Sequence, residues 1–229
     1  MRARGCGRDT GRARASVNGA APAPWIVVKL GGSLAGDPSL AHWLHELTHG
    51  GSTRFVAVPG GGPFADAVRA AQERWGFSDE VAHVMAIGAM DQFGRMLCGI
   101  EAGSIPCSTL REIEDARARG CLPIWLPGYL MTGEQRLPRN WDVTSDTIAA
   151  WLADALGAAR LLLVKSCEPP VDPGDAAALA AAGVVDSALP VFLSGRKLAL
   201  QVIHKDHWSD LKDLCDPDAV TGLASKKRL

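Results

Sequence analysis

Short apolar runs of strand length recur along the chain, and longer segments with apolar positions at helical spacing lie between them. Apolar runs of about four to eight residues, bounded by Gly, Pro or polar residues, are typical of buried strands. We expect strands at residues 25–30, 54–58, 104–107, 122–126, 160–165 and 198–204. The alternation of strands and helices favours an α/β fold with parallel strands and helices on both faces of the sheet.

Capping residues delimit the intervening helices. Asp37 precedes the first helix, and Ser78 precedes a long helix that reaches about residue 102. Thr109 and Glu112 have the spacing of a capping box, which opens a helix to about residue 119. Further helices are expected at 63–75, 144–156 and 172–182. Residues 127–140 are polar and contain turn residues, so we expect a surface hairpin or loop there.

The loop after the first strand contains Lys29, Gly31, Gly32 and Ser33. Ligands of parallel sheets bind beyond the carboxyl ends of the strands. Glycines allow a backbone to approach a phosphate closely. A lysine at a strand end can place its positive charge beside an oxygen that becomes negative during phosphoryl transfer. Taken alone, the pattern fits equally well a tight turn beside a solvated lysine.

A second glycine loop, Gly60-Gly61-Gly62, follows the next strand and precedes a helix that contains Asp66. Such a loop offers backbone donors and a helix N-terminus to an anion. Two anion sites on neighbouring strands would suit two phosphate-bearing reactants that face each other.

A third candidate lies at the start of the helix 144–156. Thr144 or Ser145 can cap this helix, and Asp146 lies in its first turn. An ordinary capped helix would explain all three residues. Asp146 could instead hold and orient lysines and keep them protonated by charge pairing. The spacing leaves both interpretations open.

Together these motifs resemble the amino acid kinase superfamily. The sequence reads KLGGS at 29–33, PGGGPFAD at 59–66 and TSDTIAAWLA at 144–153, and the resemblance extends over about residues 25–205. It implies a three-layer α/β/α sandwich with a mostly parallel sheet. It also implies one domain, 25–229, with an acceptor-binding part at 25–135 and a nucleotide-binding part at 136–229. Such enzymes transfer the γ-phosphoryl group of ATP directly and in line with the help of Mg²⁺, and they tend to form homo-oligomers.

The same resemblance implies roles for individual residues. Lys29 would stabilise the transferring phosphoryl group, and Asp146 would organise the lysines of the site. No metal ligand from the protein itself is expected. The remaining residues would bind one of the two reactants. The nucleotide would be bound by Gly31, Gly32 and Ser33, and the acceptor by Gly60, Gly61, Gly62, Asp66 and Thr144.

Two segments depart from the family's pattern. Many relatives have a TDVDGV-like nucleotide loop after the strand equivalent to 160–165, whereas this chain continues Lys165-Ser166-Cys167-Glu168. Many also carry a later glycine–methionine stretch that ends in a phosphate-binding lysine, which residues 182–186 lack. We therefore hypothesise that Lys165, with Ser166, binds the nucleotide phosphates.

The segment NWDVTSDTIAAWLA, 140–153, resembles the methanofuran-pathway branch of the family. This resemblance implies a phosphomonoester acceptor, with an aminomethylfuran methyl phosphate as the candidate. Two alternatives stay open: a carboxylate kinase that forms an acyl phosphate, and a catalytically silent nucleotide-binding or storage protein of the same fold. Arg69 is a candidate acceptor ligand, although a surface arginine would also explain it.

Composition and charge limit the possible binding partners and the cellular location of the protein. The formal net charge of −1 gives no general attraction to nucleic acid or anionic lipid. No apolar run approaches the about 18 residues of a membrane span. The six cysteines are scattered, as in cytoplasmic proteins with small buried thiols. The Arg-rich segment 1–24 lacks apolar residues to bury and is expected to be a disordered tail.

Three histidines, His42, His45 and His49, are expected on one face of the first helix. A metal site there is conceivable. The sequence places no carboxylate or cysteine to complete it, so we expect none.

Overall fold

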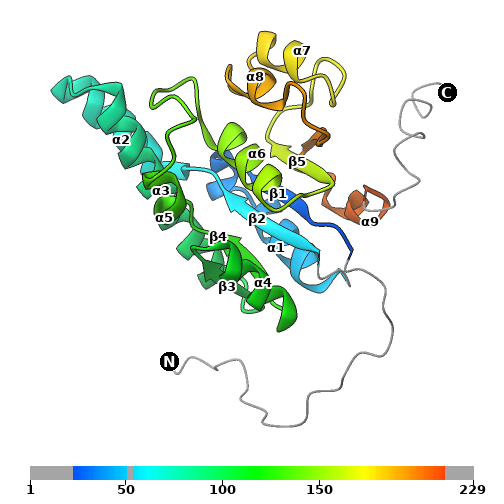
Figure 1. The fold of residues 1–229 in the computed structure, drawn as a ribbon. Helices are drawn as coiled ribbons and strands as arrows, with labels where there is room; N and C mark the ends of the chain where they lie inside the picture. The colour runs from blue at the N-terminus through cyan, green and yellow to red at the C-terminus, as the bar shows by residue number, and fades with distance from the viewer. Residues whose placement is uncertain (1–22, 51–53, 215–229) are drawn as a thin grey trace.

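The computed structural model describes residues 23–50 and 54–214, and in this part of the chain six parallel strands form one sheet (Figure 1). The strands lie in the order β3-β4-β2-β1-β5-β6. Their bounds are β1 Ile26–Leu30, β2 Phe55–Pro59, β3 Ser104–Cys107, β4 Leu122–Trp125, β5 Arg160–Lys165 and β6 Ala199–His204. The predicted α/β class and parallel sheet are confirmed.

The helices follow the predicted order with local differences. Their bounds are η1 Gly32–Gly36, α1 Ser39–His49, α2 Gly62–Trp75, α3 Asp79–Ile100, α4 Leu110–Ala118, α5 Gly128–Thr132, α6 Ser145–Ala155, α7 Ala176–Ala181, α8 Leu189–Leu193, η2 Trp208–Asp210 and α9 Leu211–Leu214. The capping box of Thr109 and Glu112 is present, and Ser78 caps α3.

The short elements η1, η2 and α9 were not predicted, and three further short elements were missed or predicted with other bounds. The expected loop at 127–140 contains α5, whose Met131 is buried. Met131 packs in the core, and Leu130 and Leu137 pack against it, so a few apolar side chains anchor this otherwise polar segment. Helix α7 is shorter than expected because it begins only after Asp175, whose side chain accepts from Ala178 N–H. Helix α8 was missed because it contains only five residues.

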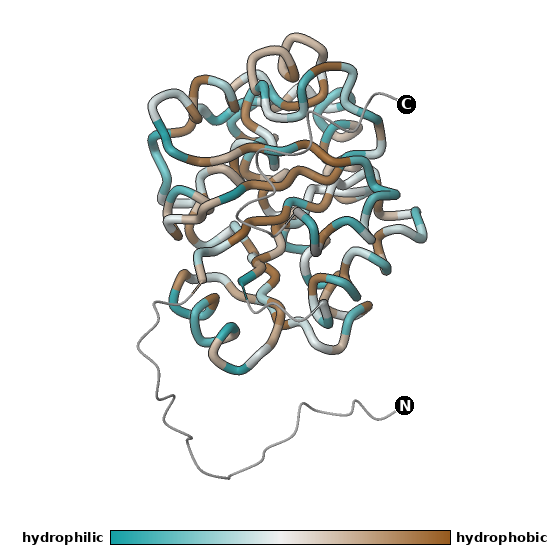
Figure 2. Tube along the Cα trace, turned by 90° about the vertical axis from the view of Figure 1, so that its right-hand side faces the viewer, coloured by the Kyte–Doolittle hydropathy of each residue, from teal (hydrophilic) through white to brown (hydrophobic). Residues whose placement is uncertain are grey.

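The two faces of the sheet are covered by different helices. In β1, Val27 and Lys29 point to one face, and Ile26, Val28 and Leu30 point to the other, as strand pleating requires. Helices α4 to α8 pack on the face of Val27, and α1, η1 and α9 pack on the opposite face. Helix α3 contributes to both clusters. Figure 2 shows the hydrophobic strands in the middle of the molecule, surrounded by more hydrophilic helices and loops.

Some predictions are not tested by this structure. The Arg-rich segment 1–24 lies almost wholly outside the described residues. The division into an acceptor-binding and a nucleotide-binding part also stays a prediction, since strands from both parts belong to one continuous sheet. No helix in the described ranges is long and apolar enough to cross a membrane.

Candidate active site

Two lysines reach the same face of the sheet from neighbouring strands. β1 and β5 pair in register, with Lys29 opposite Leu163. Lys165 lies two residues beyond Leu163, and therefore points to the same face as Lys29 and as α6. Lys29 is buried, with only 5% of its surface exposed. Strand pleating and register thus bring the two ammonium groups together at the carboxyl edge of the sheet.

Asp146 lies between these two lysines. Its Oδ1 is 2.9 Å from Lys29 Nζ, and its Oδ2 accepts a hydrogen bond of 2.6 Å from Lys165 Nζ. The carboxylate is 2% exposed. Asp146 thus contacts both lysines, and an ordinary helix start would require neither contact. The catalytic role of these three residues stays a prediction.

The charges in this cluster shift one another's pKa. Burial alone would raise the pKa of Asp146, but the charges of Lys29 and Lys165 outweigh it and hold the pKa at about 2. Burial, and then repulsion by Lys29, lower the pKa of Lys165 below its usual range, against the opposing attraction of Asp146. The two ammonium groups outnumber the one carboxylate that contacts them, which favours a further anion beside the lysines.

Asp146 is positioned by a residue that sequence reasoning missed. Asp186 accepts hydrogen bonds from the backbone N–H groups of Thr144 and Thr147, from both of their hydroxyls, and from Leu189 N–H. Thr144 is the N-cap residue of α6, but its side chain makes no cap hydrogen bond. The capping carboxylate therefore comes from Asp186, about forty residues along the chain.

The environment of Asp186 also affects its protonation. Burial, and then the charge of Asp146, raise the pKa of Asp186, while the hydrogen bonds from α6 oppose that shift. Asp186 belongs to the segment 182–186 that departs from the family's pattern. No local motif marked it, because its partners are distant in sequence.

The two glycine loops lie directly against each other. Gly60 N–H donates to Leu30 C=O at 2.8 Å. A Cβ on Gly32 would lie 2.4 Å from Gly62 N, and a Cβ on Gly60 would lie 2.4 Å from Gly32 N. Gly62 also has a φ of +55°, which favours glycine. The loops need glycine for backbone contact with each other as well as for any approach of a phosphate.

Ser33 and Ser166 join the first glycine loop to the end of β5. Ser33 Oγ donates to Ser166 Oγ at 3.2 Å, and a Cβ on Gly31 would lie 3.0 Å from Val164 C=O. The residues expected to contact the nucleotide are therefore neighbours in the structure. They lie at the carboxyl ends of β1 and β5.

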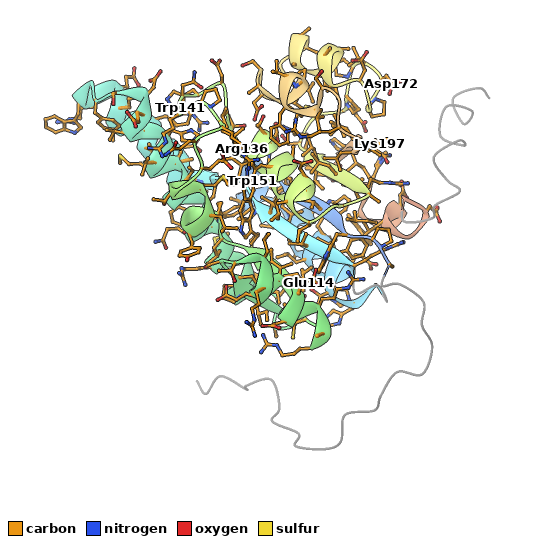
Figure 3. The ribbon with its side chains drawn as sticks, in the orientation of Figure 1. Glu114, Arg136, Trp141, Trp151, Asp172 and Lys197 are labelled. Atoms are coloured by element: carbon orange, nitrogen blue, oxygen red, sulfur yellow. The ribbon has the colours of Figure 1, made fainter. Side chains whose placement is uncertain are left out.

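A small pocket of about 50 Å³ lies between α2, α3 and the start of α6. Gly61, Arg69, Trp141, Thr144 and Ser145 are among the residues that line it. The Arg69 guanidinium lies over the Trp141 ring, 4.6 Å from its centre, and Trp141 donates to Gln72. Figure 3 shows Trp141 beside α2.

Asp66 has a different position from the one expected. It is exposed, lies outside the set of residues that line this pocket, and accepts from Arg69 Nη1 at 3.0 Å. An adjoining pocket of about 240 Å³ shares His83 and Ile87 with the first and contains Glu134. The pair of pockets is the candidate acceptor site.

The residues of the cluster fit the phosphates of ATP. Two ammonium groups lie at the carboxyl ends of β1 and β5, beside glycine loops whose backbone N–H groups can bind phosphate oxygens. The fit to Mg²⁺ is different, since Asp146 is engaged by lysines and Asp186 by the N-terminus of α6. The nucleotide's own phosphates are thus the better ligands for Mg²⁺.

Comparisons with known proteins agree with this geometry. The sequence model of the amino acid kinase family matches residues 24–168, more than half of the chain. The [5-(aminomethyl)furan-3-yl]methyl phosphate kinase of Methanocaldococcus jannaschii is 25% identical over 201 residues, which cover 83% of this chain and 92% of that protein.

Two solved structures show the same fold. The uridylate kinase of Archaeoglobus fulgidus aligns with a TM-score of 0.62 at 16% identity, and covers 82% of this chain and 95% of its own. The UMP kinase of Ureaplasma parvum aligns with a TM-score of 0.63 at 17% identity, and covers 84% of this chain and 96% of its own.

Proposed function

The chain belongs to the amino acid kinase family and is a phosphotransferase; from this premise we propose that it transfers the γ-phosphoryl group of ATP to a small phosphomonoester. The candidate acceptor is an aminomethylfuran methyl phosphate. The observation that carries the proposal is the buried cluster of Lys29, Asp146 and Lys165.

In this proposal the two lysines bind phosphate oxygens and stabilise the charge of the transition state. Asp146 holds both ammonium groups in place and does not contact the phosphoryl group as a base. Mg²⁺ bound to the nucleotide phosphates supplies further charge neutralisation. Positioning and charge then account for most of the rate acceleration, without a phosphoenzyme.

The pKa of Asp146 supports an acceptor that is already ionised. A carboxylate whose pKa is held at about 2 is a poor general base near neutral pH. An alcohol acceptor would need a base to remove its proton. A phosphomonoester has a second pKa of about 6, so it presents a charged oxygen at pH 7 without help.

The lining of the two pockets favours a phosphorylated ring among ionised acceptors. Arg69 and the hydroxyl of Ser145 can bind a phosphate, whereas the Thr144 hydroxyl already donates to Asp186, and Trp141 offers a flat apolar surface. In the adjoining pocket, Glu134 is ionised, because hydrogen bonding to Arg136 holds its pKa at about 2. Both of its oxygens already contact Arg136, and Oε2 also accepts from Trp151, so a bound aminomethyl group would share this carboxylate with them.

The donor, the location and the assembly complete the proposal. ATP is the donor that the family implies. The described cysteines are free thiols, as expected in a reducing cytoplasm. A cytoplasmic location and a homo-oligomeric state stay predictions from the family and the composition.

Incubation with Mg-ATP and a panel of acceptors tests the proposal. The panel contains aminomethylfuran methyl phosphate, UMP, simple alkyl phosphates and carboxylates, and is read out as ADP release and product mass. We expect ADP release that depends on the furan phosphate and a product heavier by one phosphoryl group. Turnover with a carboxylate alone would indicate an acyl phosphate kinase, and ATP binding without any transfer would indicate a silent protein.

Replacing Lys29 by alanine should lower kcat by about two orders of magnitude or more, because the transition state loses a cationic contact. The matched control is Lys197→Ala (Figure 3). Lys197 is exposed and comes just before β6, so it lies at the amino ends of the strands, whereas Lys29 lies near their carboxyl ends. Both variants are measured under saturating ATP and acceptor. Near-normal turnover of Lys29→Ala would remove Lys29 from the mechanism.

A further inference from the structure

Three side chains that could bind a metal ion lie near the amino ends of the strands, away from the lysines at the carboxyl ends. His45 and His49 are one helical turn apart on α1, and Glu101 caps the C-terminus of α3. The expectation that no carboxylate accompanies these histidines is wrong. Glu101 comes from a segment about fifty residues away, so the local sequence did not show it.

Each oxygen of Glu101 faces a different histidine. Oε1 is 3.2 Å from His49 Nε2, and Oε2 is 3.9 Å from His45 Nδ1. The three candidate ligand atoms all lie within 4.8 Å of one another. Metal–ligand bonds of about 2.0–2.1 Å separate tetrahedral ligand atoms by about 3.3 Å. Small rotations of two exposed imidazoles would therefore complete such a geometry.

Glu101 is fixed before any ion arrives. The side chain is only 15% exposed, and its Oε1 accepts from Gly103 N–H at 3.3 Å. The backbone carbonyl of Glu101 accepts from Ser104 Oγ at 2.7 Å. Hydrogen bonds of this kind orient a metal-binding carboxylate and lower the cost of ordering it.

The two segments that carry the ligands are also packed together. A Cβ on Gly103 would lie 2.3 Å from Cγ2 of Thr48, so the turn after α3 touches the last turn of α1. His45 and His49 belong to this end of α1. The ligand set therefore spans two elements whose relative position is already defined.

We propose that His45, His49 and Glu101 bind one divalent transition-metal ion of the Zn²⁺ class. Two imidazole nitrogens and a carboxylate oxygen suit Zn²⁺, Co²⁺ or Ni²⁺ better than Mg²⁺ or Ca²⁺, which prefer oxygen ligands. Water completes the coordination. The ion clips the end of α1 to the turn between α3 and β3, and so stabilises the folded chain independently of phosphoryl transfer.

A second group, Glu168, His204 and His207, is a weaker candidate. Its carboxylate is 66% exposed and lies 3.8 Å from each histidine. His204 Nδ1 already accepts from Asp206 N–H at 3.4 Å. This group serves as the internal comparison in the test.

Titration of the metal-free full-length protein with Co²⁺ and Zn²⁺ tests the proposal. Co²⁺ absorption in the visible range reports the coordination, and the unfolding midpoint is recorded with each metal. We expect one ion per chain, a midpoint that rises with metal concentration, and no thiolate-to-cobalt charge-transfer band. His49→Ala and Glu101→Gln should each weaken metal binding by about 100-fold. This is the upper end of the loss of metal affinity seen when a residue that supports a ligand is replaced.

Matched variants separate this site from others. His42→Ala and His207→Ala should bind Co²⁺ as the wild type does, and His45→Ala/His49→Ala should keep the wild-type kinase rate. If His49→Ala folds poorly, Glu101→Gln still decides, because it keeps the shape of the side chain. The proposal is overturned by wild type that binds no metal, by binding that survives Glu101→Gln, or by binding that is lost in His207→Ala.

Discussion

At the residue scale, Lys29 and Lys165 have the same chemical group but different surroundings. Both contact Asp146, and burial together with the neighbouring charge of Lys29 lowers the pKa of Lys165. Lys165 must be protonated to bind phosphate. Its charge is therefore lost at a lower pH than that of an exposed lysine, and phosphate binding should weaken as the pH rises through this lowered pKa.

We expect Lys165→Met to raise the KM for ATP and to lower kcat/KM, because a nucleotide phosphate loses a cationic ligand. Lys165→Arg keeps the charge at all accessible pH values. Its profile of kcat/KM against pH should lack the alkaline decline of the wild type. Normal ATP affinity in the Met variant, or an unchanged alkaline decline in the Arg variant, would contradict the role of Lys165.

The family resemblance grouped Lys29 with Asp146, and a hypothesis added Lys165; the structure brings the three side chains into contact. Two of them end neighbouring parallel strands, and the third begins a helix with a recognisable motif. Asp186 and Glu101 were not predictable in the same way. Their contacts join segments about forty to fifty residues apart, and a single sequence carries no signal for such pairs.

At the scale of elements, the contact between the two glycine loops fixes the path of the chain from β1 into η1 and from β2 into α2. A Cβ on Gly32 would meet the backbone of Gly62, and a Cβ on Gly60 would meet the backbone of Gly32, so a side chain at either position would separate the loops. The spacing between Lys29 and the pocket beside Gly61 depends on that contact.

Gly32→Ala should destabilise the fold by about 1–3 kcal/mol, as is usual when a packed site receives an extra carbon, and should strongly reduce turnover. Gly36→Ala is the control, since a Cβ at Gly36 meets nothing within 4 Å. Chemical unfolding and kinase assays on both variants provide the comparison. Equal stability and activity of the two variants would show that the loop contact is unimportant.

The elements themselves were predicted unevenly. Long periodic segments such as α2 and α3 and the apolar strands were predicted to within one or two residues, because their burial pattern is repeated along the segment. Helices α5 and α8 contain five residues each. Helices this short depend on tertiary packing rather than on local propensity.

At the scale of the whole molecule, the buried cluster links stability to charge. The pKa of Asp146 falls from 3.8 to about 2 on folding. The folded chain therefore gains stability from Asp146 at pH values above about 4, and this contribution is lost as the pH falls through about 2.

Asp146→Asn should lower the free energy of unfolding at pH 7 by about 3–5 kcal/mol, because two ammonium groups lose their buried counterion. The variant should show less acid-induced loss of stability between pH 4 and pH 2 than the wild type. Added phosphate or Mg-ATP should restore part of the lost stability by supplying an anion. Asp115→Asn, at an exposed position on α4 with one long contact of 3.9 Å to Arg111, should leave these quantities nearly unchanged.

The hydrogen bonds of Asp186 set a lower limit on the length of a working fragment. The segment that matches the family ends at residue 168, yet the N-terminus of the helix that carries Asp146 is held by Asp186. A fragment cut at 168 would contain every motif recognisable in the sequence and would still leave the donors of Thr144 and Thr147 without their acceptor. Truncation, transplantation or fusion of this catalytic unit therefore has to retain the chain through residue 186 at least.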